Sequence, residues 1–401
     1  MAADNGTTPS QRYTKATWTQ KIDVRTLTMV AVLLLLWIGF TAFTSKGFTD
    51  FGGSFMTARN LSNLTRAMAV VGIMGCGMVL VIVTGGIDLS VGTMAGFIGC
   101  AAAAMQVWWG MSTPTVVILC LLMGVVLGLL QGSVIAYVGI AAFIVTLGGQ
   151  LIFRGGILFI TKGMTIAPMR DSFKQFGNAY FGNIWGWVFA VLAIALLLAA
   201  ELRKRAARVR YNTLDESAAF MTVRWLVYSA IIVVAMLVLN GYRGLPLPVF
   251  IMLVLMLVFT LIADRTTFGR KVYAIGGNIS AAKYSGIDVK KSLTIVYALN
   301  GLLAGVAGLI LTARLNAGPT SAANMNMELD AIAAAVIGGT SMTGGVGKVA
   351  GAILGALIMA TIDNGMSIMN LMPAWQFLVK GLILVAAVWF DMQSQKKKQA
   401  S

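Results

Sequence analysis

Residues 68–105 read MAVVGIMGCGMVLVIVTGGIDLSVGTMAGFIGCAAAAM and contain a single charged side chain, Asp88. A helix needs about 20 mainly apolar residues to cross a bilayer, so this stretch accommodates two helices separated by the turn at 84–86. Comparable apolar runs recur from residue 27 to residue 389 with short polar interruptions. The sequence therefore predicts an all-α, polytopic transmembrane helical bundle.

Composition supports this class of protein. Hydrophobic residues make up 58% of the 401 positions and charged residues only 11%, a balance typical of a chain whose main solvent is lipid. The 45 glycines fit a membrane bundle because small residues let helix backbones approach closely. Two evenly spaced sets predict such packing stripes: Gly124, Gly128 and Gly132, and Gly347, Gly351 and Gly355.

Cysteine and histidine usage excludes several chemistries. Cys76, Cys100 and Cys120 all fall inside apolar runs, where they are expected to be small buried hydrophobes and not disulfide partners or metal ligands. The chain has no histidine and so lacks the commonest metal ligand and proton shuttle. We expect no metal site and no cofactor.

Charge placement predicts the topology. The formal charge of +16 does not indicate a nucleic-acid partner, because the basic residues are spread between apolar runs and not along one face. With both termini in the cytoplasm, twenty Lys and Arg fall in inner segments and seven in outer ones, as the positive-inside rule requires.

We expect about ten to twelve spans, because some runs are short or broken by glycine. The predicted segments are 27–44, 61–83, 87–106, 114–137, 143–161, 184–201, 225–240, 247–264, 292–313, 331–343, 348–370 and 375–391. They define a transmembrane domain, 27–391, between a cytoplasmic tail, 1–26, and a basic cytoplasmic tail, 392–401. Residues 202–224 and 265–291 are expected to form cytoplasmic loops.

A short motif occurs twice. TGGIDLSVGTMAG (84–96) and TGGVGKVAGAILG (343–355) align at an offset of 259 residues and share one threonine and four glycines. Two related halves built from glycine-broken helix pairs would surround a transport path. The alternative is two independent glycine turns.

Polar residues within the apolar runs are candidates for the path of a solute. Asp88 follows Gly85 and Gly86, so its carboxylate can cap a new helix or, as an ionisable group within a membrane protein, contact a solute. Asn300, Asn324 and Asn364 are further candidates, and a wider set comprises Asn326, Gln131, Gln150 and Trp375. Buried amides also bond to neighbouring helices.

The cytoplasmic stretch 268–291, FGRKVYAIGGNISAAKYSGIDVKK, predicts a short helix beneath the membrane. Asn278 is suited to its N-cap and Gly286 to its end. From the residues alone, the segment can also be an amphipathic helix held to anionic lipid by its Lys and Arg side chains.

The glycine-rich segment 338–349, GGTSMTGGVGKV, does not fit a phosphate-binding loop. The pattern G-x-x-x-x-G-K-[ST], placed on Gly347 and Lys348, has Met342 at its first glycine and Val349 at its last position. The chain is therefore not expected to be an enzyme, and ATP would have to be hydrolysed elsewhere.

Four segments carry a resemblance to a known family. They are ARNLSNLTRAMAVVGIMGCGMVLVIVTGGIDLSVG (58–92), FIVTLGGQLIFRGG (143–156), FGRKVYAIGGNISAAKYSGI (268–287) and ELDAIAAAVIGGTSMTGGVGKVAGAILGALIMATIDNGMSIM (328–369). The chain resembles the membrane permease subunits of bacterial sugar ABC importers, which include ribose, galactose and xylose permeases. The extra span pair at about 185–240 and the TIDNGMSIM segment resemble the xylose branch.

The resemblance implies an importer of a monosaccharide in the bacterial inner membrane. Its partners would be a second permease copy, a cytoplasmic ATPase, a periplasmic sugar-binding protein and membrane lipid, with no nucleic acid. It also implies that the short cytoplasmic helix docks on the ATPase through Gly277, Asn278, Ala281, Ala282, Ser285, Gly286 and Ile287.

A secondary transporter driven by an ion gradient is the main alternative. Such proteins bury titratable groups along their path, and the candidates here are Asp88, Asp363 and Lys380, with Glu328 and Asp330 near an outer boundary. A docking helix for an ATPase has no use in that class of protein.

We predict that both termini and the loop 202–224 are cytoplasmic, because of the distribution of basic residues. In a background without native cysteines, single cysteines replacing Thr8, Thr213 or Gln395 should react with a membrane-impermeant thiol reagent only after the cells are opened. Labelling of any of the three in intact spheroplasts would overturn this topology.

Overall fold

The computed structural model describes residues 24–45, 53–210 and 218–400. Most of the predicted tail 1–26, and residues 211–217 of the predicted loop 202–224, lie outside these ranges. In chain order the elements are α1 (Val24–Thr44), α2 (Ala58–Val83), α3 (Val91–Val107), α4 (Thr113–Ser133), the π-helical turn η2 (Val134–Val138), α5 (Ala142–Thr161), α6 (Asp171–Asn178), β1 (Tyr180–Phe181), α7 (Asn183–Arg210), α8 (Ala218–Asn240), β2 (Leu245–Pro246), α9 (Leu247–Arg265), α10 (Thr267–Gly277), α11 (Ile279–Tyr284), α12 (Val289–Leu315), the 3₁₀ turn η3 (Thr320–Asn324), α13 (Met327–Ile337), α14 (Val349–Ile368) and α15 (Pro373–Ala400).

Within these ranges, ten helices are long and apolar enough to cross a membrane by length and composition. They are α1, α2, α4 continued by η2, α5, α7, α8, α9, α12, α14 and α15. The strands β1 and β2 are two residues each and pair antiparallel. The predicted all-α polytopic bundle is therefore confirmed, at the lower end of the expected ten to twelve spans.

Two predicted spans differ from the structure. The prediction of a crossing at 331–343 is wrong, since α13 has 11 residues and reaches only about 16 Å, roughly half of the hydrocarbon layer. It stops because Gly339, two residues after its end, has a φ angle of 105°, which a helix cannot continue through. Helix α3 begins four residues later than predicted and is an apolar helix of 17 residues.

The C-terminal boundary also differs. The predicted last span, 375–391, and residues 392–400 of the predicted tail form one continuous helix, α15, that runs from Pro373 to Ala400. Lysines beyond the apolar segment are compatible with a helix, since Lys has a high helix propensity.

Helix α2 lies at the centre of the bundle. In its most apolar segment 83% of the residues are buried, against 11% in α7 and in α8 and none in α15. Helix α12 packs against α2, α3 and α4, and α14 packs against α2 and α13. The core therefore consists of α2, α3, α4, α12, α13 and α14.

Glycines set the spacing of this core. A β-carbon at Gly124 would lie 2.3 Å from the carbonyl oxygen of Gly301, and one at Gly355 would lie 2.0 Å from that of Ala334. Real side chains do not fit at such distances, so these backbones are in direct contact. The predicted packing role of both glycine stripes is confirmed.

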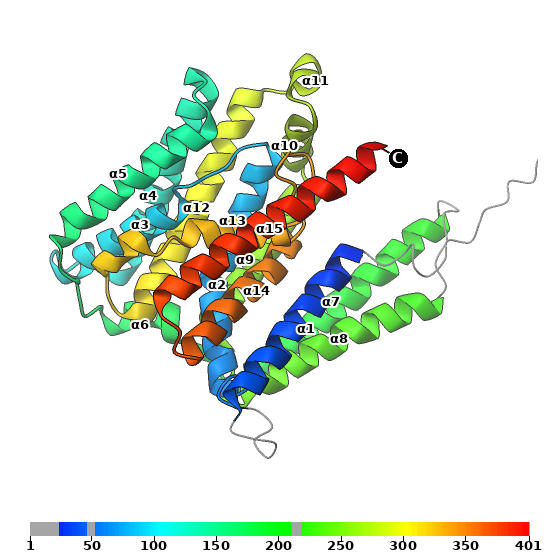
Figure 1. Cartoon of the computed structure of the whole chain (residues 1–401), viewed down its shortest axis with the longest axis horizontal. Coiled ribbons are helices and arrows are strands. Elements are labelled where there is room, and N and C mark those ends of the chain that lie inside the picture. The colour runs from blue at the N-terminus through cyan, green and yellow to red at the C-terminus, as the bar shows by residue number, and fades with distance from the viewer. Residues whose placement is uncertain (1–23, 46–52, 211–217, 401) are drawn as a thin grey trace, which may run out of the picture.

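Helices α1, α7 and α8 form the edge of the bundle (Figure 1). Trp37 of α1 donates a hydrogen bond of 3.2 Å from Nε1 to Thr361 Oγ1 of α14. Helices α7 and α8 pack on each other, and Arg224 of α8 forms an ion pair with Glu201 of α7. Apart from the basic end of α7, residues 203–210, their remaining surface is mainly apolar and largely exposed, as expected for helices facing lipid.

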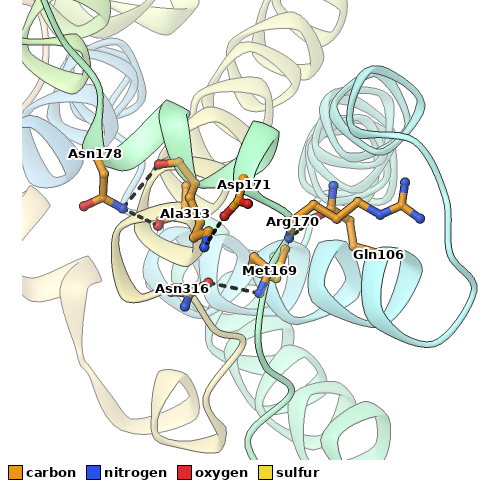
Figure 2. Close-up of polar contacts among 8 residues, drawn as sticks. Gln106, Met169, Arg170, Asp171, Asn178, Ala313 and Asn316 are labelled. Carbon is orange, nitrogen blue, oxygen red and sulfur yellow. Dashed lines mark hydrogen bonds and ion pairs between the residues drawn. The ribbon is translucent and has the colours of Figure 1, made fainter.

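A short helix, α6, covers the end of the bundle opposite α11 (Figure 1). Asn178 donates from Nδ2 to the carbonyl oxygen of Ala313 at 2.8 Å, and Asn316 Oδ1 accepts the Met169 N–H at 3.0 Å (Figure 2). The Arg170 N–H donates to Gln106 Oε1 at 3.3 Å. These bonds attach the segment to α12 and α3, so it is a fixed surface and not a loose loop.

Replacement of Gly128 by Ala is expected to destabilise the bundle. The new methyl carbon would lie 2.2 Å from the carbonyl oxygen of Tyr297, and overpacking of this kind costs about 1–3 kcal/mol. The melting temperature of the purified protein in detergent should fall by a few degrees.

Gly148→Ala is the matched control, since a β-carbon there has no heavy atom within 4 Å. It should leave the melting temperature unchanged. Equal losses in the two variants would show that the contact between α4 and α12 is not the cause.

Candidate functional site

A buried polar network centres on Asp88, in the link between α2 and α3. Its side chain is 1% exposed. Oδ1 accepts hydrogen bonds from the Ser90 backbone N–H at 2.8 Å and from Ser90 Oγ at 2.7 Å, and Oδ2 accepts one from Asn300 Nδ2 at 2.7 Å. Burying a carboxylate is costly unless it is hydrogen-bonded, and here both oxygens have donors.

The network differs in detail from the predicted helix cap. The N-cap position of α3 is Ser90, not Asp88, and the Ser90 side chain does not bond to the helix. Instead its hydroxyl donates to Asp88 and accepts a bond of 2.9 Å from Gln131 Nε2 of α4. Asp88 therefore joins the start of α3 to α4 and, through Asn300, to α12.

Tyr297 lies beside this network, one helical turn before Asn300. Its ring is 1% exposed, and a β-carbon on Gly86 would lie 2.7 Å from its hydroxyl oxygen. Among the described residues that hydroxyl has no hydrogen-bond partner. The absence of a side chain at Gly86 thus makes room for a buried tyrosine against the turn that carries Asp88.

A second acidic group, Glu328 of α13, also faces the first turn of α3. Gln150 of α5 donates from Nε2 to Glu328 Oε1 at 2.6 Å. A β-carbon on Gly92 would lie 2.3 Å from Glu328 Oε2, so the carboxylate rests on the backbone of α3. The N-terminus of a helix favours nearby negative charge, which stabilises both Asp88 and Glu328 there.

The structure separates the other predicted path residues from this network. Asn364 of α14 and Asn60 of α2 form a reciprocal amide pair, with bonds of 2.9 and 2.8 Å. Asn324 is exposed in the turn η3. Of the four main candidates for the solute path, which are Asp88, Asn300, Asn324 and Asn364, only Asp88 and Asn300 contact each other.

Sequence reasoning did not connect Ser90 or Tyr297 with this region, and it named Glu328 only as a titratable group near an outer boundary. Ser90 and Tyr297 are ordinary residues of a membrane helix, and Glu328 stands 240 residues after Asp88 in the chain. The only available signal was that each is polar within an apolar run, which does not reveal a shared location.

An ion-paired triad joins α13, α14 and α15. Lys380 Nζ lies 2.9 Å from Asp330 Oδ2 and 2.8 Å from Asp363 Oδ2. A cavity of about 220 Å³ adjoins it, lined mainly by apolar side chains and including Asp330, Lys380 and Phe377. This triad attaches α15 to α13 and α14, and Asp391, further along α15, accepts a bond from the Met342 N–H at 3.3 Å.

The segment between α9 and α12 contains the predicted short helix. Asn278 is its N-cap, and Asn278 Oδ1 accepts the Ala281 N–H at 2.9 Å. Gly286 has a φ of 79° and follows the helix end, and the Ile287 N–H bonds to the Ala282 carbonyl at 3.1 Å. The predicted cap and stop of α11 are therefore confirmed. Helix α10, directly before it, was not predicted.

Exposure shows which side of α11 is open. Ala282 is 4% exposed and faces the permease itself, whereas Tyr284 is 92% and Ile279 54% exposed. Gly277, Ala281 and Ser285 are also exposed. A partner approaching α11 would meet Ile279, Ala281 and Tyr284, while Ala282 anchors the helix.

The glycine-rich connection 338–348 follows helix α13 and precedes α14. A phosphate-binding loop needs a preceding strand and a different residue pattern. This connection is therefore part of the packing of the bundle and not a nucleotide site.

Comparison with known proteins identifies the family. Residues 60–388 match the family model of the permease component of branched-chain amino acid transport systems. The chain is 42% identical over 378 residues to the xylose transport system permease protein XylH of Escherichia coli K12, covering 94% of each chain. It is 43% identical to XylH of Haemophilus influenzae, covering 86% of this chain and 92% of the relative. It is 34% identical to the ribose import permease protein RbsC of Escherichia coli K12, covering 85% and 88%.

No solved structure matches the chain. The family match spans most of the sequence, from the second helix to the last, and contains the Asp88 network, helices α10 and α11 and both glycine turns. This chain is a non-catalytic, multi-pass membrane protein that belongs to the family of permease components of bacterial ABC transport systems.

Proposed function

We propose that this chain is the membrane permease subunit of an ABC importer that carries a monosaccharide, D-xylose, across the bacterial inner membrane. The observation that carries the proposal is the 42% identity to a xylose permease over 94% of both chains. The ribose permease is less similar, at 34%. The hairpin of α7 and α8 occupies the segment by which the sequence resembles the xylose branch.

The energy for import would come from a partner ATPase on the cytoplasmic side. Helix α11 supports this part of the proposal, because it is a capped helix with an open face that includes Tyr284, an aromatic residue suited to an interface. Gly277, Asn278, Ser285, Gly286 and Ile287 would shape and end this docking segment.

The remaining partners are assigned by position. A periplasmic sugar-binding protein would approach the outer face, where α6 is a fixed surface. The exposed apolar sides of α4, α5 and α15 would be covered by lipid and by a second copy of the permease. Both termini would be cytoplasmic.

For the solute path, we propose that Asp88 and Asn300 act by holding three helices in register. Both oxygens of Asp88 are already satisfied within the protein, which favours positioning over direct contact with a sugar. Asn364, paired with Asn60, would link helices in the same way. Asn324, exposed in η3, is the candidate most available to a passing solute.

The second candidate function, an ion-gradient transporter, rests on one observation, the ion-paired triad of Lys380, Asp330 and Asp363, of which Asp330 is buried and the other two are partly exposed. Titratable groups within a membrane domain are characteristic of proton-coupled carriers. The same triad also explains how α15 is attached, which requires no ion coupling.

The two functions are separated by an uptake assay. The permease, a partner ATPase and a xylose-binding protein are reconstituted in proteoliposomes, and uptake of labelled xylose is followed with and without ATP. We expect uptake that requires ATP and persists when ionophores collapse the proton and sodium gradients. Uptake abolished by the ionophores and independent of ATP would refute the importer proposal.

Substrate specificity is tested by measuring the uptake of ribose and galactose under the same conditions as that of xylose. If xylose is carried at least about tenfold faster, the difference corresponds to roughly 1.4 kcal/mol of discrimination. Equal rates for all three sugars with their respective binding proteins would contradict a permease dedicated to xylose.

The role of Asp88 is tested by two substitutions. Asp88→Asn keeps an oxygen that can accept the Ser90 N–H, so assembly and most of the uptake should be retained. Asp88→Leu leaves the donors of Ser90 and Asn300 without an acceptor, at about 1–3 kcal/mol each, and should lower both the amount of folded protein and uptake. Normal assembly of Asp88→Asn with uptake abolished would show that the charge itself is needed.

A further inference from the structure

The end of helix α10 lies against both copies of the Thr-Gly-Gly turn. A β-carbon on Gly276 would be 1.7 Å from the Val83 carbonyl oxygen and 2.5 Å from the Gly345 nitrogen. The two turns also bond to each other, since the Gly345 N–H donates to the Val83 carbonyl at 2.9 Å. We call this meeting of residues 83–85, 276–277 and 344–345 the glycine junction.

The junction consists of backbone in contact with backbone. Gly85, Gly344 and Gly345 have φ angles of 82°, 87° and 74°, a conformation that favours glycine. A β-carbon on Gly345 would lie 3.1 Å from the nitrogen and Cα of Gly277. Since no rotatable side chains lie between these segments, a displacement of α10 cannot be absorbed by a change of rotamer.

A side-chain bond attaches α10 to the same place. The Tyr273 hydroxyl donates to the Gly347 carbonyl at 2.8 Å. Burial, and secondarily the Asp264 carboxylate, raise the pKa of this phenol above its usual value, so it stays protonated and able to donate at neutral pH. Helix α10 is thus fixed to the connection that leads into α14.

The junction adjoins the buried polar network. Gly86 and Asp88 directly follow residues 83–85, and α12, which begins after the docking helix α11, carries Asn300 to Asp88. The docking loop is therefore linked to the Asp88 region from both of its ends: α10 contacts the turn that precedes Asp88, and α12, which continues the chain from the loop, bonds to Asp88 through Asn300.

We propose that Gly276 is a positioning residue of the transport cycle. Because Gly276 has no side chain, α10 rests directly on both glycine turns. Displacement of the docking loop then moves the end of α2 and the start of α14 together. This inference rests on the proposed ATP-driven import. It separates two roles of the loop, since α11 binds the ATPase and α10 passes its movement to the bundle.

The test uses the complete transporter, with the ATPase and the sugar-binding protein, in proteoliposomes. For each variant three quantities are measured: the amount of ATPase that co-purifies, the rate of ATP hydrolysis, and the amount of xylose imported per ATP. The last quantity is a ratio, so a lower yield of folded protein does not change it.

Gly276→Ala should co-purify with the ATPase as the wild type does, because the exposed face of α11 is unaltered. Xylose per ATP should fall by about tenfold, because the methyl group forces α10 away from the turns and overpacking of this kind costs at least about 1.4 kcal/mol. Tyr284→Ala should have the opposite profile, with weak ATPase binding and normal xylose per ATP in the complexes that form.

Ala274→Ser is the matched control, because Ala274 is exposed on the same helix and should accept one added oxygen without effect. Tyr273→Phe removes only the hydroxyl that bonds to Gly347 and should lower xylose per ATP by about threefold to fivefold, the value of one hydrogen bond. This variant tests the junction even if Gly276→Ala does not fold.

Normal xylose per ATP in a folded Gly276→Ala transporter would overturn the inference. If Gly276→Ala fails to fold, a normal amount of xylose imported per ATP in Tyr273→Phe would also overturn the inference. If the wild-type complex itself imports no sugar with ATP, the proposed function fails. If the wild type imports sugar and both variants equal it, only the role of the junction is refuted.

Discussion

The close approach of helix backbones is the constraint on which this structure depends. In lipid the hydrophobic effect does not drive helices together, so association relies on van der Waals packing and on bonds between backbones and polar side chains. The contacts Gly124 to Gly301 and Gly355 to Ala334 leave no room for a methyl group. Through them, α4 packs directly on α12, and α14 directly on α13, and α2 is enclosed between the two pairs.

This close packing explains why the bundle can hold buried charge. Asp88 and Glu328 both lie at the N-terminus of α3, where neighbouring glycines bring backbone and donor groups within reach. The helix end and the amides of Asn300 and Gln150 stabilise the two carboxylates. The outer triad of Lys380, Asp330 and Asp363 satisfies charge by pairing instead. The two arrangements have different consequences: the first ties the core helices together, and the second attaches a peripheral helix.

The proposed transmission of movement would rely on the same glycines. A partner that displaced α11 would act on α10 and α12, which flank α11 in the chain. Helix α10 contacts the glycine junction, and α12 carries Asn300. Interiors packed at this density transmit displacement with little compression, so the junction and the Asp88 network would respond together. Movement of α11 would in this way reach the core of the bundle.

Periodicity and composition were sufficient for the helical class, the ten long spans, the glycine stripes and the cap and stop of α11, because each depends on neighbouring residues and on the length of apolar runs. They could not reveal that α13 stops after 11 residues, since the positive φ angles of Gly339 and its neighbours are set by tertiary contacts. Nor could they bring Glu328 to α3, separate Asn364 from Asp88, or turn Ala282 inward. The two Thr-Gly-Gly turns were visible as a repeated motif, but their meeting at Gly276 joins segments about 70 to 260 residues apart, and only packing in three dimensions decides such contacts.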